Sequence, residues 1–250
     1  MSSYQIIILA AGKGTRMGEA DMPKVLFPLD GTPIISHLLI ALQGLTLATK
    51  PVLVVGYQQE KVREALGDTV LYAVQEQQLG TAHAVMAARG AIQSENIIVL
   101  YGDMPFISAA SIRQLMAAHD ASHSMLSMFT AHVPYFEDEY AFSNAFGRII
   151  RDASGAVVRI TELKDATEEE KKITEINPGI YAFNAKWFWD NAEKIQNKNN
   201  QHEYYLTDSI EIAIQQGIKV NTLPIQPEEV FGINTRAEWE QAHQSLKKPR

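Results

Sequence analysis

Residues 6–24 read I-I-I-L-A-A-G-K-G-T-R-M-G-E-A-D-M-P-K, and this stretch decides the fold. The apolar run at its start is typical of a β-strand that is buried on both faces. Gly12 and Gly14 follow, and glycines let the backbone turn tightly and approach a ligand closely. Arg16 and Lys24 then add positive charge. A buried strand that opens into a glycine-rich cationic loop offers N–H donors and cations, and therefore predicts a polyphosphate site.

The spacing of this loop differs from the two best-known phosphate loops. A Walker motif needs G-x-x-x-x-G-K-[ST], which does not occur around Lys13, and the dinucleotide fingerprint needs G-x-G-x-x-G. Gly12, Gly14 and Gly18 give a spacing that is one residue too long. A glycine-rich surface turn with basic neighbours is the alternative. The run L-A-A-G-x-G-x-R-M, followed by P-K, favours a nucleotide site.

Composition excludes several classes of protein. The 250-residue chain is 46% hydrophobic, which is ample for a compact core. It has no cysteine, which excludes disulfides, thiolate catalysis and Cys-ligated zinc. Its net charge of −7 argues against a nucleic-acid partner and favours a small nucleotide. No apolar run approaches the length of a membrane span and no signal peptide is evident, so we expect a cytoplasmic protein without membrane association.

Strand and helix patterns alternate through the first half of the chain. Strands are predicted at Tyr4–Leu9, Val52–Val55, Leu71–Val74 and Ile97–Tyr101, and helices near Ile34–Leu45, Gln59–Leu66 and Thr81–Ala91. This alternation predicts an α/β fold, a Rossmann-like and mostly parallel sheet with helices on both faces. Ligands of such sheets bind at the carboxyl ends of the strands, so the loops after Leu9, Val74 and Tyr101 should converge on one crevice.

The second half of the chain predicts a small β-containing lobe over the sheet, mainly within residues 133–210. Its strands are expected at Gly147–Asp152, Val157–Leu163 and, interrupted by Asn177–Pro178–Gly179, Thr174–Phe183. Helices near Trp187–Ile195 and Thr207–Gln216, a strand at Lys219–Leu223 and a helix at Ala237–Leu246 follow. We expect one domain over residues 1–236, followed by a C-terminal helix and tail over 237–250.

Polar residues after the predicted strands are candidates for chemistry. Asp103 follows a strand in Y-G-D-M-P, where it either faces the crevice or caps a turn. If the first loop binds a triphosphate, Asp103 becomes the natural ligand of a Mg²⁺ ion. Gln75, with Gly80 and Thr81, is suited to reading a base edge, or forms an ordinary strand–helix connection. Asn234 either serves the site or shares with Thr235 the capping of the last helix.

Other polar residues give weaker signals. Side chains of the second lobe suit sugar hydroxyls, although such residues more often lie on the surface: Glu162, Asn177, Glu203, Tyr205, Thr207 and Asp208. His119 and His123 stand four apart without an evident third ligand, so we interpret them as a polar helix end rather than a metal site. No G-x-S-x-G motif is present, which argues against a serine-hydrolase triad.

Taken together, these segments resemble the nucleotide-sugar pyrophosphorylases, and most of all the uridylyltransferase domains of bacterial N-acetylglucosamine-1-phosphate uridylyltransferases. The matching runs, in the order of the family from Leu9 to Arg236, are L-A-A-G-K-G-T-R-M, P-K-V-L-F-P-L, Q-L-G-T-A-H-A-V, Y-G-D-M-P, F-G-R-I-I-R-D, T-E-L-K-D-A-T, E-I-N-P-G-I-Y, E-Y-Y-L-T-D and G-I-N-T-R. The opening run is shared with cytidylyl- and guanylyltransferases, whereas E-I-N-x-G-I-Y and E-Y-Y-L-T-D are more specific.

The resemblance implies a Mg²⁺-dependent enzyme that forms a UDP-sugar, UDP-N-acetylglucosamine above all, and pyrophosphate from UTP and a sugar 1-phosphate. It implies a catalytic group of Arg16, Lys24 and Asp103, with Asp103 and Asn234 as metal ligands. It implies that the nucleotide is bound by Leu9, Ala10, Ala11, Gly12, Gly14, Gln75, Gly80 and Thr81. It implies that the sugar side is lined by Tyr101, Gly102, Gly147, Glu162, Asn177, Glu203, Tyr205 and Thr207.

Departures from the family pattern leave alternatives open. Pro178 stands where the family usually has Thr, and His202 where it has Gly, and both flank the expected sugar site. The left-handed β-helix acetyltransferase domain of the bifunctional members does not occur in this sequence, which ends at Arg250. A cytidylyltransferase acting on another phosphorylated metabolite, and a nucleotide-sugar sensor without turnover, are the competing functions. The sequence does not indicate the oligomeric state.

Overall fold

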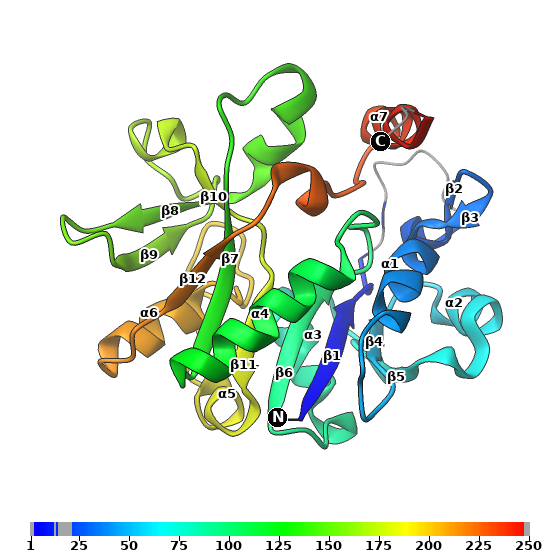
Figure 1. Cartoon of the computed structure of the whole chain (residues 1–250), viewed down its shortest axis with the longest axis horizontal. Coiled ribbons are helices and arrows are strands. Elements are labelled where there is room, and N and C mark those ends of the chain that lie inside the picture. Colours follow the sequence, from blue (N-terminus) through cyan, green and yellow to red (C-terminus); the bar gives the residue numbers. More distant parts are fainter. Residues whose placement is uncertain (1–2, 13, 15–21, 248–250) are drawn as a thin grey trace.

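The computed structural model describes residues 3–12, 14 and 22–247 of the chain. Lys13, Arg16 and Gly18 lie outside the described residues, so the phosphate role predicted for Arg16 stays a prediction. The described chain folds around one large mixed sheet with helices packed on both faces (Figure 1), as the sequence predicts. Within the described ranges, no helix combines the length and the apolar character that crossing a bilayer requires.

The first half of the chain builds the parallel part of the sheet. Its strands lie in the order β5 (Leu71–Val74), β4 (Val52–Val55), β1 (Tyr4–Leu9) and β6 (Asn96–Tyr101), each parallel to its neighbour. β1 and β4 are buried along their whole length, because helices cover both of their faces. The carboxyl ends of β1 and β6 therefore reach the same edge of the sheet (Figure 1).

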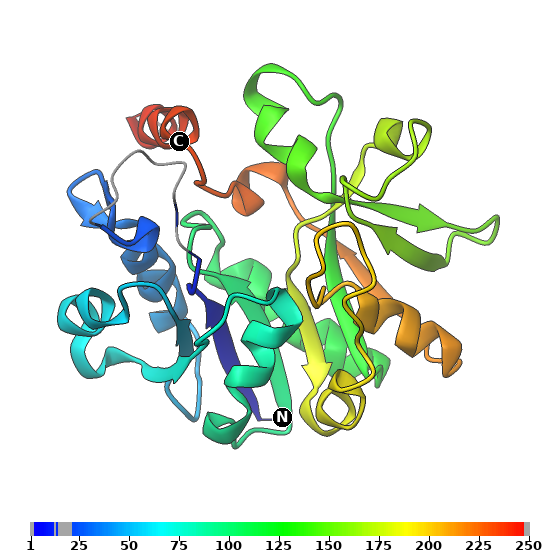
Figure 2. The ribbon, with the colours of Figure 1, turned by 180° about the vertical axis from the view of Figure 1, so that it is seen from behind.

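Two sets of helices cover opposite faces of this sheet (Figures 1 and 2). One face carries α1 (Ile34–Gln43), α2 (Gln59–Leu66) and α4 (Ala109–Ser122), and the other carries α3 (Thr81–Ala87), α5 (Ala185–Ala192) and α6 (Asp208–Gln215). Ile6 and Ile8 belong to the core under the first set, and Ile7 and Leu9 to the core under the second. Successive side chains of a strand point to opposite faces, so β1 supplies both cores.

The second half of the chain extends the same sheet with antiparallel strands. From β6 the order continues through β11 (Tyr181–Asn184), β7 (Leu126–His132), β10 (Glu175–Asn177), β8 (Gly147–Arg151) and β9 (Val157–Thr161), while β12 (Asn221–Pro224) runs parallel to β7. β7 pairs with β11 at its start and with β10 at its end. The second lobe is therefore continuous with the sheet, whereas the sequence predicts a lobe laid over it.

The last helix, α7 (Arg236–Lys247), packs beside β2 (Pro28–Leu29), which forms a hairpin with β3 (Thr32–Pro33). A third hydrophobic cluster joins these elements to the second lobe and consists of Phe27, Leu29, Ile34, Phe142, Phe231, Ile233 and Ala242. Segments from the beginning, middle and end of the chain meet in this cluster. It holds the turn before α7 close to the loop that contains Lys24.

Some elements differ from the sequence prediction. The predicted third helix reaches residue 91, but α3 ends at Ala87 and a 3₁₀ turn follows at Arg89–Ala91. The interruption predicted within Thr174–Phe183 is confirmed, because β10 ends at Asn177, β11 begins at Tyr181 and Gly179 between them has a φ of 79°. The patterns give no bounds for an element over residues 109–132, where α4 and β7 form, although a helix end is expected at His119 and His123.

Candidate active site

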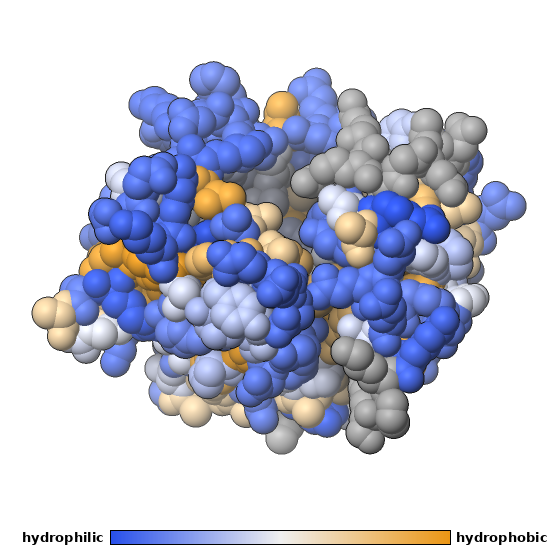
Figure 3. Space-filling view, turned by 90° about the horizontal axis from the view of Figure 1, so that it is seen from above, coloured by the Kyte–Doolittle hydropathy of each residue, from blue (hydrophilic) through white to orange (hydrophobic). Residues whose placement is uncertain are grey.

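The loops after β1, β5 and β6 meet at one edge of the sheet, as the fold class predicts. They enclose a cavity of about 240 Å³, here called the β1 cavity, lined by Leu9, Ala10, Ala11, Gly12, Lys24, Val25, Gln75, Gln78, Gly80, Thr81, Ala84, Tyr101, Asp103 and Glu203. Because these loops come from neighbouring parallel strands, the cavity presents backbone groups of several chain segments to one ligand. Seen from above, the molecule is hollowed between the second lobe and the parallel part of the sheet (Figure 3).

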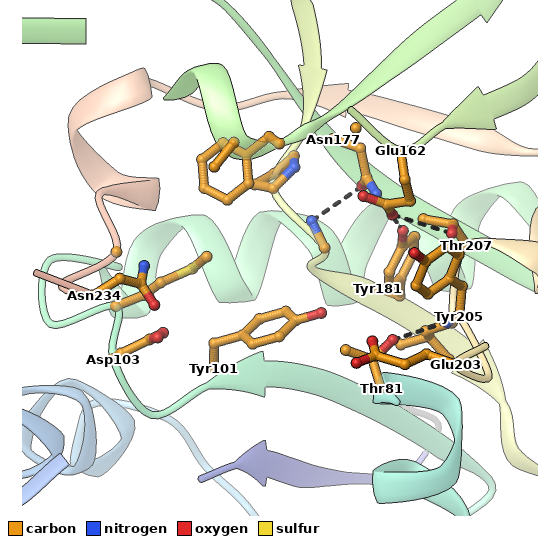
Figure 4. Close-up of a pocket in the computed structure, with 18 of the residues that line it drawn as sticks. Thr81, Tyr101, Asp103, Glu162, Asn177, Tyr181, Glu203, Tyr205, Thr207 and Asn234 are labelled. Carbon is orange, nitrogen blue, oxygen red and sulfur yellow. Dashed lines mark hydrogen bonds between the residues drawn. The ribbon is translucent and has the colours of Figure 1, made fainter. Parts of the chain in front are cut away.

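A second cavity of about 290 Å³, here called the lobe cavity, adjoins the first. Its walls include Gly147, Glu162, Asn177, Tyr205, Thr207 and Asn234, and it shares Thr81, Tyr101, Asp103 and Glu203 with the β1 cavity. In Figure 4, Tyr101 lies between Asp103 and Asn234 at one end and Glu162, Asn177 and Thr207 at the other. The two cavities therefore form one extended site, and Tyr101 belongs to the wall that they share.

The wall between the cavities depends on two close backbone approaches. Gly80, with a φ of 114°, lies so near Tyr204 that an added Cβ would come within 2.6 Å of its carbonyl oxygen. Gly179 lies against Tyr101 in the same way, with 2.7 Å between an added Cβ and the ring. Any larger residue at either position would be strained and would displace its neighbour. Burial, followed by the charges of Glu162 and Asp103, raises the pKa of Tyr101, which stays protonated.

The chain before α3 is tied to the second lobe by hydrogen bonds. The Thr81 hydroxyl oxygen accepts from the Leu206 N–H at 2.9 Å, so it holds the lobe rather than capping α3. The backbone N–H groups of Ala82 and Tyr204 donate to the carbonyls of Tyr204 and Leu79, respectively. These bonds align the wall of the β1 cavity with the wall of the lobe cavity.

Polar groups of the lobe cavity are held in fixed orientations. The Thr207 hydroxyl donates to Glu162 at 3.2 Å, and burial raises the pKa of the Glu162 carboxyl. The buried Asn177 side chain accepts from the Gly179 N–H at 3.0 Å and donates to the Tyr181 hydroxyl at 2.6 Å. Fixed acceptors and donors of this kind suit hydroxyl and amide groups of a ligand.

Lys24, Asp103 and Asn234 converge where the two cavities meet. The Lys24 ammonium forms an ion pair with the Asp103 carboxylate and donates to the Asn234 side-chain oxygen at 2.7 Å. Asn234 is free to do this because Thr235 and Glu238 cap α7. In this capping box the Thr235 hydroxyl accepts from the Glu238 N–H, and the Glu238 carboxylate accepts from the N–H groups of Asn234 and Thr235.

The Asp103 carboxylate and the Asn234 amide oxygen fit a Mg²⁺ ion. Both are hard oxygen donors, and they already converge on one cation, the ammonium of Lys24. Among the described residues, no group of three or more His, Cys, Asp or Glu side chains is gathered as a metal site. A Mg²⁺ ion commonly takes few protein ligands and completes its coordination with water and substrate phosphates.

Several predicted residues lie away from the cavity walls. Gly14 lies against the Lys24 side chain, and Gly102 packs between Val25 and Ala10. These glycines shape the loops that carry Lys24 and Asp103. Asp208, a weaker candidate, also lines neither cavity, whereas the other described residues predicted for the site line one or both. Sequence reasoning missed several lining residues: Gln78, Ala84, Met104, Phe146, Gly179, Tyr181 and Gln201. Single apolar or amide residues carry no signal without a fold to place them.

His119 lies in the last turn of α4 but is buried, which corrects its interpretation as part of a polar helix end. Its Nδ1 is 2.8 Å from the Ser127 hydroxyl, and burial lowers its pKa. His123 ends the helix in a left-handed conformation. Neither residue lines the two cavities.

Comparison with known proteins agrees with this geometry. The Bifunctional protein GlmU of Desulfotalea psychrophila is 40% identical over 246 residues, which are 97% of this chain and 70% of that protein. That of Caldicellulosiruptor saccharolyticus is 43% identical over 245 residues, 96% of this chain and 51% of that protein. The fold also matches the crystal structure of UDP-glucose pyrophosphorylase complexed with UDP-glucose, with a TM-score of 0.78 over 100% of each chain. Because the sequence identity to this structure is 16%, the similarity shows that the two proteins share a fold.

A mixed Rossmann-like sheet, together with these relatives, defines the chain as a nucleotidyltransferase. It belongs to the family of MobA-like NTP transferase domains, which its residues 6–168 match. The resemblance stated from the sequence motifs is thereby confirmed. Several of its curated GlmU relatives are about twice as long as the chain, which spans about half of their length.

Proposed function

We propose that the chain transfers a uridylyl group from UTP to a sugar 1-phosphate, forming a UDP-sugar and pyrophosphate in a Mg²⁺-dependent reaction. N-acetylglucosamine 1-phosphate is the first candidate for the acceptor. The observation that carries the proposal is the arrangement of two joined cavities with Lys24 and Asp103 where they meet. A nucleotide in the β1 cavity and a sugar phosphate in the lobe cavity would have their phosphates side by side at this junction.

The junction supplies the charge that such a transfer needs. The sugar-phosphate oxygen attacks the α-phosphorus of UTP, and pyrophosphate leaves. Within the described residues, the positive charge at this point comes from the Lys24 ammonium. Arg16, which follows β1 in the same loop, is proposed to bind the phosphates as well. Holding two anions together and neutralising them accounts for most of the catalysis in phosphoryl transfer. The attacking phosphate is already ionised at neutral pH, so the site needs neither a nucleophilic side chain nor a general base.

Asp103 and Asn234 are the residues that would hold the Mg²⁺ ion. When bound, the ion supplies neutralisation of the charge that develops on the transferring and leaving phosphates. The Asp103 carboxylate forms an ion pair with the Lys24 ammonium. Lys24 thereby keeps the Asp103 carboxylate compensated in a partly buried site, where an uncompensated charge would be costly.

The second lobe, mainly residues 133–210, is proposed to bind the sugar. Glu162 and Asn177 lie at the far end of the lobe cavity from Asp103, where sugar hydroxyl and amide groups would be expected. Gly147 lets Ile160 and Glu162 approach the backbone of β8 closely, because an added Cβ would meet them at 2.9 Å and 3.4 Å. Pro178, which replaces the usual Thr of the family, lines the same cavity and is proposed to influence the choice of sugar.

A substrate panel tests the proposal. The protein is incubated with Mg²⁺, each of UTP, CTP, GTP and dTTP, and each of several sugar 1-phosphates, and pyrophosphate release is measured. We expect the highest kcat/KM with UTP and N-acetylglucosamine 1-phosphate, and loss of activity with EDTA. A preference for CTP would support the cytidylyltransferase alternative. Calorimetric binding of UTP without pyrophosphate release from any pair would support a sensor, and either result would reject the proposal.

A further inference from the structure

The side chain of Gln75 has a defined orientation in the wall of the β1 cavity. Gln75 follows β5, is 3% exposed, and its Nε2 donates to the Gly80 carbonyl oxygen at 3.1 Å. A carbonyl oxygen can only accept a hydrogen bond, so the nitrogen of the amide, and not its oxygen, must face Gly80. The orientation of the amide therefore follows from a backbone group whose chemistry is fixed.

The second hydrogen of the same amide nitrogen is directed at His83. The distance from Gln75 Nε2 to His83 Nδ1 is 3.0 Å, and His83 lies on the first turn of α3. Nδ1 accepts this bond when the imidazole is neutral and carries its hydrogen on Nε2. The His83 ring lies beside that of Tyr204, with centroids 6.5 Å apart. His83 does not line the β1 cavity, so it acts on a ligand only through Gln75.

These two bonds occupy both hydrogens of the Gln75 amide and leave its oxygen as the available group. In the described part of the chain no hydrogen bond is donated to Oε1, and Gln75 lines the β1 cavity. The cavity therefore presents a fixed hydrogen-bond acceptor at this point. Uracil carries a donor, the N3–H group, on its pairing edge, whereas cytosine carries a lone pair at N3. A fixed acceptor placed opposite N3 therefore matches uracil and repels cytosine.

We propose that His83 is a positioning residue for base selection, which holds the Gln75 amide with its oxygen toward the nucleotide and thereby favours UTP over CTP. The inference rests on the proposed function and deepens it. Without the Nδ1 acceptor, one amide hydrogen of Gln75 loses its partner. The bond to the Gly80 carbonyl then holds the amide alone, so the orientation with the nitrogen toward the cavity, where it would donate to cytosine N3, costs one hydrogen bond instead of two and discrimination between the two bases weakens.

A matched pair of substitutions tests the role of His83. Asn places a side-chain oxygen at the same number of bonds from Cα as Nδ1, so His83→Asn keeps the acceptor, whereas His83→Leu removes it. The kcat/KM values for UTP and CTP are measured for each protein. We expect His83→Leu to lower the UTP/CTP ratio about tenfold, as for the loss of one hydrogen bond, and His83→Asn to keep it within about threefold of wild type.

A purely structural role for His83 predicts a different result. Both substitutions would then lower the rates with UTP and CTP in parallel and leave the ratio unchanged, which would overturn the inference. His83→Gln, whose oxygen lies one bond farther out, provides a second variant if His83→Leu does not fold, and its ratio should fall as well. A wild-type protein that turns over neither nucleotide refutes the proposed function. A wild-type preference for UTP that is retained in His83→Leu and His83→Gln refutes the role of His83 alone.

Discussion

The ammonium of Lys24 lies directly against the carboxylate of Asp103, although 79 residues separate them in the chain. Both side chains are mostly buried, with exposed fractions of 13% and 15%. Lys24 comes from the loop after β1 and Asp103 from the loop after β6, and these two strands are neighbours in the sheet. In the proposed reaction, a nucleotide phosphate and a metal ion would meet at this pair.

Replacement of Asp103 tests the metal role. We expect Asp103→Asn to lower kcat at least about a hundredfold, because the amide cannot supply the negative charge that holds Mg²⁺ and pairs with Lys24. Isothermal titration of Mg²⁺ in the presence of UTP should show weaker metal binding. Asp190→Asn, which removes an exposed carboxylate from a surface ion pair, is the control and should change neither quantity. Near-normal Mg²⁺-dependent turnover in Asp103→Asn would remove Asp103 from this role.

Replacement of Lys24 tests whether its ammonium binds the phosphates of UTP. Lys24→Ala removes the ammonium group that lies where the two cavities meet. We expect the Kd for UTP to rise about tenfold to a hundredfold, which is the effect of losing one charge-assisted hydrogen bond. Equilibrium binding of UTP measures the effect without requiring turnover. Lys50→Ala provides a matched control, because Lys50 bonds the Asp68 carbonyl and lines neither cavity. Equal UTP affinity in Lys24→Ala and wild type would contradict the assignment.

Gly80 should tolerate no side chain. Gly80→Ala combines a positive φ with a clash against the Tyr204 backbone, and we expect it to lower the free energy of unfolding by about 2 kcal/mol or more. Gly217→Ala separates the two effects, because Gly217 also has a positive φ, 74°, but an added Cβ there would meet nothing within 4 Å. Thermal unfolding should therefore place the Tm of Gly80→Ala below that of Gly217→Ala. Equal melting temperatures would show that the contact with Tyr204 yields easily.

The pKa of Asp208 gives the lobe a pH-dependent stability. Burial, followed by the charges of Glu211 and Glu162, raises the pKa of Asp208 to about 6. The folded protein then holds a proton that the unfolded chain releases, so this group makes the protein less stable as pH rises from about 4 to about 6. Asp208→Asn does not titrate, so its stability relative to wild type should increase across that window. Urea unfolding at pH 4, 5, 6 and 7 would show a parallel pH dependence if the shift were absent.

His202 occupies a backbone conformation that suits glycine. Its φ is 56°, and its side chain is exposed. His202→Gly should relieve strain of about 1 kcal/mol, offset in part by the greater freedom of glycine in the unfolded chain. We expect a Tm higher by up to about 3 °C. Lys198→Gly, at an exposed position without a positive φ, should instead lower the Tm. A lower Tm for His202→Gly would show that the side chain has stabilising contacts.

The parallel half of the fold could be predicted closely from the sequence. β1, β4, β5 and α2 have the predicted bounds, because short apolar runs and a helical repeat were bounded by turn residues. The bounds of α4 and β7 were missed because neither element has a strong apolar pattern. α4 presents only a narrow apolar stripe, which includes Ile112 and Leu115. β7 carries Ser127 and Thr130 among its buried residues, so it lacks the uniform apolar pattern of the other core strands.

Part of the candidate site could also be predicted from the sequence, and part of it needed the structure. The glycine-rich loop, Lys24 and Asp103 could be named from the sequence, because the ends of parallel strands must lie at one edge of the sheet. Asn234 could be either a cap or a site residue, and only the structure shows that Thr235 and Glu238 cap α7. The choice depends on which side chain reaches the helix N-terminus, and the residue types alone permit both.

The sequence by itself determined the class of fold and the family, and it predicted a phosphate-binding first loop, because these depend on local runs of residues. Only the tertiary structure decided that Tyr101 lines both cavities, that Lys24 meets both Asp103 and Asn234, and that His83 contacts the Gln75 amide. The physical reason is that the residues of each contact come from different helices, strands and loops. Their distances are set by the packing of the sheet and its helices, which no local pattern encodes.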